Sequence, residues 1–276
     1  MTLWWLLTRM SGSRGRMFYR PTSWLALHLC LASLPGSVMA QGKAGEANGP
    51  RICVMTPLDL IAGTNATLKI RGLKLSGATG VAITAASQNI KAEIRVKKTV
   101  DVPKGLEAKD VGDSLAEVEI VVPSGLVGGE LMISLITPDG KTQPRAVRVV
   151  DGGLFVDEKE PNDGFRNAQV LSPGKGVHGT IGSDKDVDVY AITGHAKKVL
   201  VAELVAARVG SLLDAVLTLY DEKGRVLASC DDSGGSRDPQ LRFKLPVDGK
   251  YFLTIQDASD HGSPWHAYAL SAKEEP

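Results

Sequence analysis

Oxygen-bearing side chains that could bind a cation are concentrated in one short stretch, "EKEPNDGF", at residues 158–165. Glu158, Glu160 and Asn162 alternate in this stretch, so in an extended chain their side chains lie on one side, about 7 Å apart. Pro161 favours an extended neighbour and keeps the stretch from coiling. Carboxylate and amide oxygens crowded in this way are the ligands that Ca²⁺ coordinates. A solvated polar linker is the other interpretation of the same composition.

A second acidic group, Asp184, Asp186 and Asp188, begins after Ser183 and again alternates, at the entrance to a predicted strand. Two such rows side by side would provide the roughly six to eight oxygens that Ca²⁺ prefers. Without a cation, the close carboxylates would repel each other by roughly 1 kcal/mol or more per pair, even in a wet site. The pattern therefore predicts a calcium site.

A capping turn would explain the first stretch without a metal. In that alternative, the side chains of Asn162 and Asp163 accept hydrogen bonds from backbone N–H groups around Gly164. The sequence leaves both interpretations open. A further acidic run, Asp231-Asp232, is followed by Ser-Gly-Gly and is predicted to lie in a polar hairpin loop without a metal.

The residue patterns of an active site are missing, so no catalytic and no cofactor-binding residues are predicted. No histidine after residue 40 lies in the helical spacing of a zinc protease, and no glycine-rich phosphate loop precedes a helix. Ser124 lacks the strand–turn–helix context of a hydrolase nucleophile. His261 and His266 flank Gly262-Ser263-Pro264 and are predicted to lie in a surface loop. The chain is predicted not to be an enzyme.

Residues 1–40 have the composition of a Sec-type signal peptide. They contain four arginines and no acid, then an apolar run from Trp24 to Leu34, then small residues for cleavage at Val38-Met39-Ala40. The apolar run is about half the length that a membrane-spanning helix needs, so no span is predicted in the mature chain. Residues 41–49 are predicted to form a tether. The protein is thus expected to be secreted, periplasmic or held at the cell surface.

The charge and the cysteines of the mature chain fit an exported protein. The whole chain carries a formal charge of +1, so removal of four arginines leaves a slightly acidic body. Such a body argues against nucleic-acid binding. Cys53 and Cys230 remain, and an oxidising compartment would permit a bridge between them. Two separate, part-buried thiols are the other interpretation.

Alternating apolar residues predict strands in residues 50–150, which form the first domain. The runs "ATLKIRGLKL" (66–75), "AEVEIVVPSG" (116–125) and "ELMISLITPDGKT" (130–142) each place apolar residues on one face and contain a Gly or Pro turn. "RAVRVVDGG" (145–153) closes the segment. Runs of period two without a helical stripe indicate an antiparallel sandwich.

These residues resemble an IPT/TIG domain, an immunoglobulin-like module. The likeness is carried by "TPLDLIAGTNATLKIRGLKL" (56–75), which resembles its opening, and by "VVPSGLVGGELMISLITPDGKT" (121–142), which resembles its second half. The resemblance implies a spacer or a contact surface, since such domains usually carry no site chemistry.

Eight more strand candidates follow in the second domain, residues 154–273, and predict a jelly-roll-like sandwich. The segment 221–224, Asp-Glu-Lys-Gly, is predicted to be a tight turn with glycine at a positive φ. The candidate strands are Val177–Ile181, Val187–Thr193, Val199–Val205, Ala215–Tyr220, Arg225–Ser229, Leu241–Leu245, Tyr251–Gln256 and Trp265–Ala272. The predicted fold class is all-β, with two β-sandwich domains after a cleaved signal peptide.

The second domain resembles the bacterial pre-peptidase C-terminal domain, a relative of the collagen-binding modules of clostridial collagenases. One departure from the family pattern is Cys230, where a small polar residue is commoner. The segments that carry the resemblance are "EKEPND" (158–163), "GTIGSDKDVDVYAI" (179–192), "LLDAVLTLYDEKGRVLASCDD" (212–232), "LPVDGKYFLTIQD" (245–257) and "HAYALS" (266–271).

The resemblance to the collagenase modules implies calcium ligands in both acidic rows, with Ser183 and the backbone of Tyr190 as weaker candidates. It also implies that the partner is an extracellular or envelope polymer, polysaccharide or protein, contacted through a sheet face. The protein is therefore expected to be an exported, non-catalytic adhesion or binding protein. An accessory or chaperone module for a separately encoded secreted peptidase is the alternative. The implied calcium ligands are Glu158, Glu160, Asn162, Asp163, Asp186 and Asp188.

Overall fold

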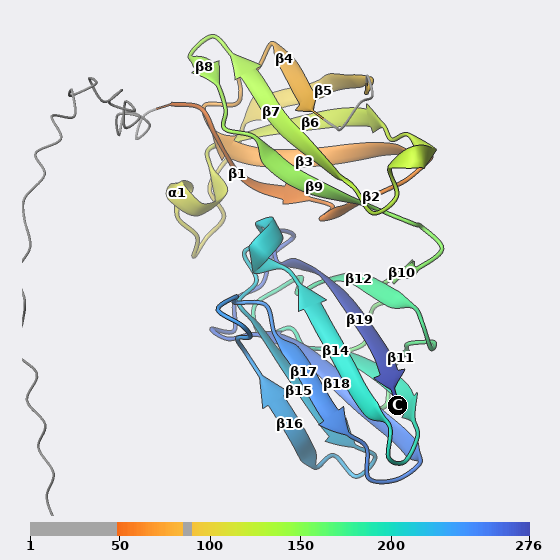
Figure 1. Ribbon diagram of the computed structural model, residues 1–276. Coiled ribbons are helices and arrows are strands. Elements are labelled where there is room, and N and C mark those ends of the chain that lie inside the picture. The colour runs from red at the N-terminus through yellow and green to blue at the C-terminus, as the bar shows by residue number, and fades with distance from the viewer. Residues whose placement is uncertain (1–48, 85–89) are drawn as a thin grey trace, which may run out of the picture. The chain divides into compact units, whose positions relative to one another are not determined.

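Nearly all of the regular secondary structure in the described chain is β-strand. The computed structural model describes residues 49–84 and 90–276, which form four sheets in two β-sandwiches (Figure 1). Both sandwiches belong to one compact unit, Gly45–Pro276. The predicted all-β fold class is confirmed. The predicted signal peptide at residues 1–40 and most of the tether at 41–49 lie outside the described residues.

Two sheets form the first sandwich, which runs from orange to green in Figure 1. One sheet has the strand order β1-β3-β6-β5 and is antiparallel. The other has the order β2-β9-β7-β4, with β8 paired to β7, and its β2 and β9 are parallel. The strands are β1 (Arg51–Thr56), β2 (Asp59–Ile61), β3 (Asn65–Leu73), β4 (Gly80–Thr84), β5 (Ala92–Thr99), β6 (Ser114–Val121), β7 (Glu130–Thr137), β8 (Gly140–Lys141) and β9 (Arg145–Val150).

The predicted alternation of apolar residues builds the core of this sandwich. Leu68 and Ile70 of β3 are fully buried, as are Leu131, Ile133 and Leu135 of β7. Every second side chain of a strand points to the same face, so these residues all point toward the facing sheet. The sequence pattern missed β1, β2, β4 and β5. Strand β5 lies at a sheet edge and contains no fully buried residue, which explains its weak apolar alternation.

A buried negative charge lies at the start of β2. The side chain of Asp59 is 0% exposed, and its two oxygens each accept a hydrogen bond from Arg148 at 2.6 Å. His178 Nε2 lies 2.9 Å from Asp59 Oδ2. Burial alone would raise the pKa of Asp59, but the hydrogen bonds from His178 and Arg148 outweigh burial and lower the pKa.

This ion pair predicts how the stability of the protein changes in acid. A lowered folded-state pKa contributes stability that is present above the unfolded pKa of about 3.9 and is lost as the pH falls through the folded value. We expect Asp59→Asn to lower the free energy of unfolding by about 3 kcal/mol at pH 7, because Arg148 loses its charge partner. The variant should also lose stability less steeply below about pH 4.

Urea unfolding measured from pH 2 to pH 7 checks this expectation. Asp139→Asn is the matched control, because Asp139 is exposed in the turn between β7 and β8. If the free energy of unfolding fell equally steeply in acid for wild type and Asp59→Asn, this result would contradict the role assigned to Asp59.

The second sandwich runs from teal to blue in Figure 1 and consists of two sheets with five strands each. Their strand orders are β10-β12-β19-β14-β17 and β11-β13-β18-β15-β16. The strands are β10 (Phe155–Asp157), β11 (Gln169–Val170), β12 (Gly176–Thr180), β13 (Asp188–Gly194), β14 (Val199–Val205), β15 (Ala215–Asp221), β16 (Val226–Cys230), β17 (Gln240–Lys244), β18 (Gly249–Asp257) and β19 (Ala267–Glu275).

All eight strands predicted for this sandwich are confirmed, with end residues that differ slightly. The predicted turn before β16 is also present, and its Gly224 has a φ of 76°. The sequence pattern missed β10 and β11, which have three and two residues and are too short for an alternation to be recognised. Both pair in parallel with a longer neighbour, β10 with β12 and β11 with β13.

Helices contribute little to the described chain. They are α1 (Ala108–Val111) and the 3₁₀ turns η1 (Ser124–Leu126) and η2 (Ala207–Val209). In the described part of the chain, no helix has the length and apolar content needed to cross a membrane. Cys53 and Cys230 are both free thiols, which agrees with the interpretation of two separate cysteines.

Candidate metal centre

The predicted ligands lie where two loops of the second sandwich meet. One loop joins β10 to β11 and contains 158–163; the other joins β12 to β13 and ends at Asp188, the first residue of β13. The parallel pairs β10–β12 and β11–β13 hold the ends of both loops side by side. The two acidic rows of the sequence therefore come together in space.

The carboxylates form two clusters that share Glu160. In the inner cluster, one oxygen each from Glu158, Glu160 and Asp188 lie within 4.8 Å of one another. In the outer cluster, the same holds for Glu160, Asp163 and Asp186. The inner cluster is the more buried, because Asp188 is 0% exposed. Five of the six predicted ligands are thus in the clusters, and the sixth, Asn162, contacts the inner one.

Hydrogen bonds from buried side chains fix Glu158 in the inner cluster. Its Oε1 accepts a hydrogen bond from Asn162 Nδ2 at 3.2 Å and lies 3.1 Å from the hydroxyl oxygens of Tyr190 and Tyr268. Its Oε2 accepts the backbone N–H of Thr180 at 2.9 Å. The two tyrosine hydroxyls lie 2.6 Å apart. Burial raises the pKa of both tyrosines, so both stay neutral and donate.

The neighbouring Glu158 disfavours ionisation of Asp188. Burial, followed by the hydrogen bond and the charge of Glu158, raises the pKa of Asp188 to about 9. The hydroxyl of Tyr268 donates to Asp188 Oδ2 at 2.5 Å, which lowers that pKa only in part. Burial is also the largest cause of the raised pKa of Glu160. Both shifts express the cost of holding several carboxylates together without a positive charge.

Two buried oxygens in this centre have no hydrogen-bond partner among the described residues. They are Asn162 Oδ1 and Asp188 Oδ1, and both residues are 0% exposed. An unsatisfied buried polar atom costs about 1–3 kcal/mol. A hard cation bound between the loops would satisfy both oxygens and offset the repulsion of the carboxylates. The donor set is entirely oxygen, which fits Ca²⁺ better than Zn²⁺.

The capping turn considered for the first acidic row does not form at Asn162. Its Nδ2 donates to Glu158, its Oδ1 receives no backbone N–H, and its own N–H donates to Glu160 Oε2 at 3.0 Å. Asp184 lies outside both clusters and accepts the backbone N–H of Gly262 at 3.1 Å, which ties the second loop to the β18–β19 loop. Asp184 therefore positions the loop instead of joining the centre.

The sequence pattern did not indicate the tyrosine hydroxyls. The resemblance implies only the backbone of Tyr190 as a ligand, whereas its hydroxyl donates to Glu158. Tyr190 follows Asp188 by two residues, so both point to the same face of β13. That spacing could have revealed Tyr190, but nothing in the sequence indicates Tyr268, which comes from β19.

One prediction for the β18–β19 loop is wrong. His266 is only 2% exposed, because it immediately precedes the buried start of β19. Its Nδ1 lies 2.8 Å from Ser263 Oγ, and this oxygen also accepts the backbone N–H of Trp265 at 3.2 Å. Ser263 thus stabilises a turn. His261 is exposed, as predicted.

Comparison with known proteins identifies part of this sandwich. Residues 186–257 match the family model of the bacterial pre-peptidase C-terminal domain. The match begins at Asp186 in the outer cluster and ends at Asp257, the last residue of β18. This match within the second sandwich agrees with the resemblance noted in the sequence. The IPT/TIG resemblance of residues 50–150 stays a prediction.

Similar proteins include enzymes and inhibitors. A probable subtilase-type serine protease of Deinococcus radiodurans is 34% identical over 162 residues, which are 51% of this chain and 22% of that protein. The chain thus covers less than a quarter of that relative.

Among solved structures, the pre-peptidase C-terminal domain of a collagenase from Bacillus anthracis matches with a TM-score of 0.32 and 17% identity, over 42% of this chain and 100% of that one. The periplasmic lysozyme inhibitor PliG of Aeromonas hydrophila matches with a TM-score of 0.28 and 14% identity, over 44% and 96%. Both similarities are too low to indicate a function.

Proposed function

We propose that this chain is an exported, non-catalytic binding protein of a bacterial envelope or exterior, with a structural calcium site. The pre-peptidase C-terminal domain would bind an extracellular or envelope polymer, polysaccharide or protein. The first sandwich, with its IPT/TIG resemblance, would serve as a spacer or contact surface. Without residues 1–40 the chain would carry a slight net negative charge, which argues against nucleic-acid binding.

The two unpartnered buried oxygens carry the calcium part of this proposal. Asn162 Oδ1 and Asp188 Oδ1 come from different loops; Asp188 belongs to the inner cluster, and Asn162 contacts that cluster through Glu158. A cation held there would join the two loops and stabilise the entrance of the second sandwich. The cation would be held by Glu158, Glu160, Asn162 and Asp188. The outer carboxylates, Asp163 and Asp186, would add negative charge or provide a second position for a cation.

A thermal melt of the purified protein, with Ca²⁺ and with a chelator, tests the calcium site. A cation that binds only the folded state raises the free energy of unfolding by about 2.7 kcal/mol when its free concentration is about 100 times the dissociation constant. For two sandwiches of this size, the midpoint should rise by about 5–10 °C. Identical curves in Ca²⁺ and in chelator would remove the metal from the proposal.

An array of glycans and matrix proteins tests the polymer part. We expect selective binding to one polymer class, and weaker binding in chelator if the polymer contacts residues near the two loops. Turnover of any compound in a broad substrate screen by the purified protein would contradict the non-catalytic assignment.

The relative from Deinococcus radiodurans favours a second candidate, because its name is that of a probable serine protease. In this candidate the chain is an accessory or chaperone module for a separately encoded secreted peptidase. Co-purification of a peptidase with the tagged chain, and altered peptidase maturation after its deletion, would support this role over direct polymer binding.

A further inference from the structure

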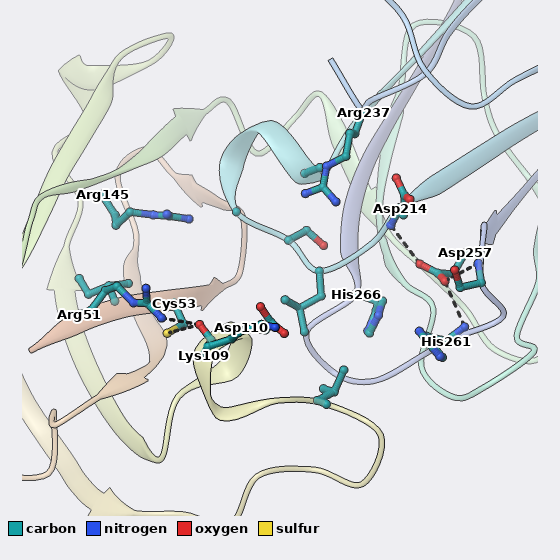
Figure 2. A pocket seen from close by; sticks show the side chains of 17 residues that line it. Arg51, Cys53, Lys109, Asp110, Arg145, Asp214, Arg237, Asp257, His261 and His266 are labelled. Carbon is teal, nitrogen blue, oxygen red and sulfur yellow. Dashed lines mark hydrogen bonds between the residues drawn. The ribbon is translucent and has the colours of Figure 1, made fainter. Parts of the chain in front are cut away.

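A cavity of about 510 Å³ lies within the compact unit, away from the acidic clusters. Its lining comes from β1, the α1 segment and β9 of the first sandwich, and from the η2 turn and the β18–β19 loop of the second. Figure 2 shows charged side chains on opposite sides of this cavity. Its volume is in the range of small-ligand sites.

Three arginines supply positive charge to the cavity. Arg51 Nη2 donates to the carbonyl of Lys109 at 2.5 Å, which fixes one guanidinium at the wall. Arg145 and Arg237 also line the cavity, and the guanidinium group of neither one forms a hydrogen bond or ion pair with another described residue. Guanidinium groups without a partner are suited to bidentate binding of an oxyanion.

Backbone geometry places Arg145 at this wall. Gly210 has a φ of +95°, and a Cβ atom at this position would overlap the Nη2 atom of Arg145. The left-handed backbone favours glycine at this position. The guanidinium of Arg145 therefore lies directly against the η2 turn.

His266 adds a neutral donor. Ser263 Oγ accepts the N–H of Trp265, so its hydroxyl hydrogen is available to His266 Nδ1 at 2.8 Å. This assignment leaves the proton of the imidazole on Nε2. Burial lowers the pKa of His266, so the ring is neutral at pH 7.

Acceptors line the same cavity. Asp257 is already saturated, because its carboxylate accepts the backbone N–H groups of Asp214, Ser259 and His261 (Figure 2). The carboxylates of Asp110 and Asp214 line the cavity and receive no hydrogen bond from any described residue. The wall therefore combines free guanidinium groups with free carboxylates.

We propose that this cavity binds an acidic saccharide. Its carboxylate or sulfate groups would bind Arg145 and Arg237, and its hydroxyls would donate to Asp110 and Asp214. A simple anion such as phosphate could bind the guanidinium groups but would leave those two carboxylates short of donors, whereas a sugar ring presents an oxyanion and several hydroxyl donors together. An acidic peptide offers few hydroxyls and fits the free carboxylates poorly. This inference rests on the proposed binding function and names the class of polymer.

Isothermal titration of the whole protein with defined oligosaccharides tests the inference. The probes are a galacturonate hexamer, a sulfated galactan hexamer and the fully methyl-esterified, neutral galacturonate hexamer. We expect one of the two acidic probes to bind and the neutral one to bind at least about tenfold more weakly, since charge-assisted hydrogen bonds are lost. The two acidic probes separate carboxylate from sulfate recognition.

Arg145→Gln and Arg237→Gln should each weaken binding of the acidic probe by about tenfold. Arg95→Gln is the matched control, because Arg95 lies on β5, pairs with Glu93 and Glu119, and does not line the cavity. Thermal melts of all variants in Ca²⁺ show whether each one is folded.

Four results would overturn the inference: no binding of either acidic probe, equal binding of the neutral ester, equal weakening by Arg95→Gln, or tighter binding of polyglutamate than of both sugars. The calcium melt does not depend on the cavity. A protein that keeps its calcium response and binds another polymer on the array would thus retain the proposed function and lose only this inference.

Discussion

The Asp188→Asn variant is expected to be less stable than wild type in calcium, but as stable as wild type or more stable when calcium is removed. In chelator at pH 7, the variant should be as stable as wild type or more stable by about 1 kcal/mol, because Asp188, with a pKa of about 9, must take up a proton when the protein folds, whereas the amide is neutral in both states. The amide that replaces the carboxylate can still accept the hydroxyl of Tyr268 and can donate to Glu158, so the hydrogen bonds around the inner cluster are conserved.

In saturating Ca²⁺ the order should invert. Wild type gains about 2.7 kcal/mol at a free calcium concentration of about 100 times its dissociation constant, and the variant gains far less. The loss of a charged ligand weakens the site, since Ca²⁺ affinity depends on the number of charged oxygens. A purely structural role for Asp188 predicts no such crossing, because the variant would then lose stability in both conditions.

Thermal and urea unfolding of both proteins, with Ca²⁺ and with chelator, measure the crossing. Asp232→Asn is the control, because Asp232 is exposed in the β16–β17 loop and its side chain forms no hydrogen bond with another described residue. It should follow wild type in both conditions. Parallel changes in Asp188→Asn and wild type on adding calcium would show that Asp188 is not a ligand.

Gly179→Ala should destabilise the protein by about 3 kcal/mol and reduce its calcium response. Gly179 lies on β12 opposite Tyr268 of β19, and a Cβ atom there would overlap the hydroxyl and the Cζ atom of Tyr268. That ring is fully buried, so it can move only by disturbing the core, and overpacking of this kind typically costs about 1–3 kcal/mol. Displacement of the hydroxyl also removes a donor from Glu158 and Asp188.

Gly164→Ala is the matched control for this substitution. A Cβ atom at Gly164 would meet no other atom within 4 Å, so its effect on stability should stay within about 0.5 kcal/mol. Urea unfolding followed by circular dichroism, with and without Ca²⁺, compares the two variants. A Gly179→Ala variant as stable as wild type would mean that the Tyr268 ring is free to shift and does not fix the inner cluster.

The long strands could be predicted from the sequence because their pattern is local. Tyr251, Leu253 and Ile255 alternate along β18 and share one buried face, and a strand of this kind packs that face against another sheet. The short strands β10 and β11 could not be predicted in this way. They exist because longer neighbours offer them hydrogen-bond partners, which is a property of the tertiary structure.

The acidic rows themselves are a property of the sequence, since Glu158, Glu160 and Asn162 lie close together in the chain, as do Asp186 and Asp188. The all-β class likewise follows from the order of residues alone. Only the tertiary structure decided that the rows meet, which oxygens stay unpaired, and that the Tyr268 hydroxyl from the last strand lies within hydrogen-bond distance of both Glu158 and Asp188. The physical reason is that a local pattern fixes which face a side chain occupies, whereas its neighbours from distant strands depend on how the sheets pair and pack.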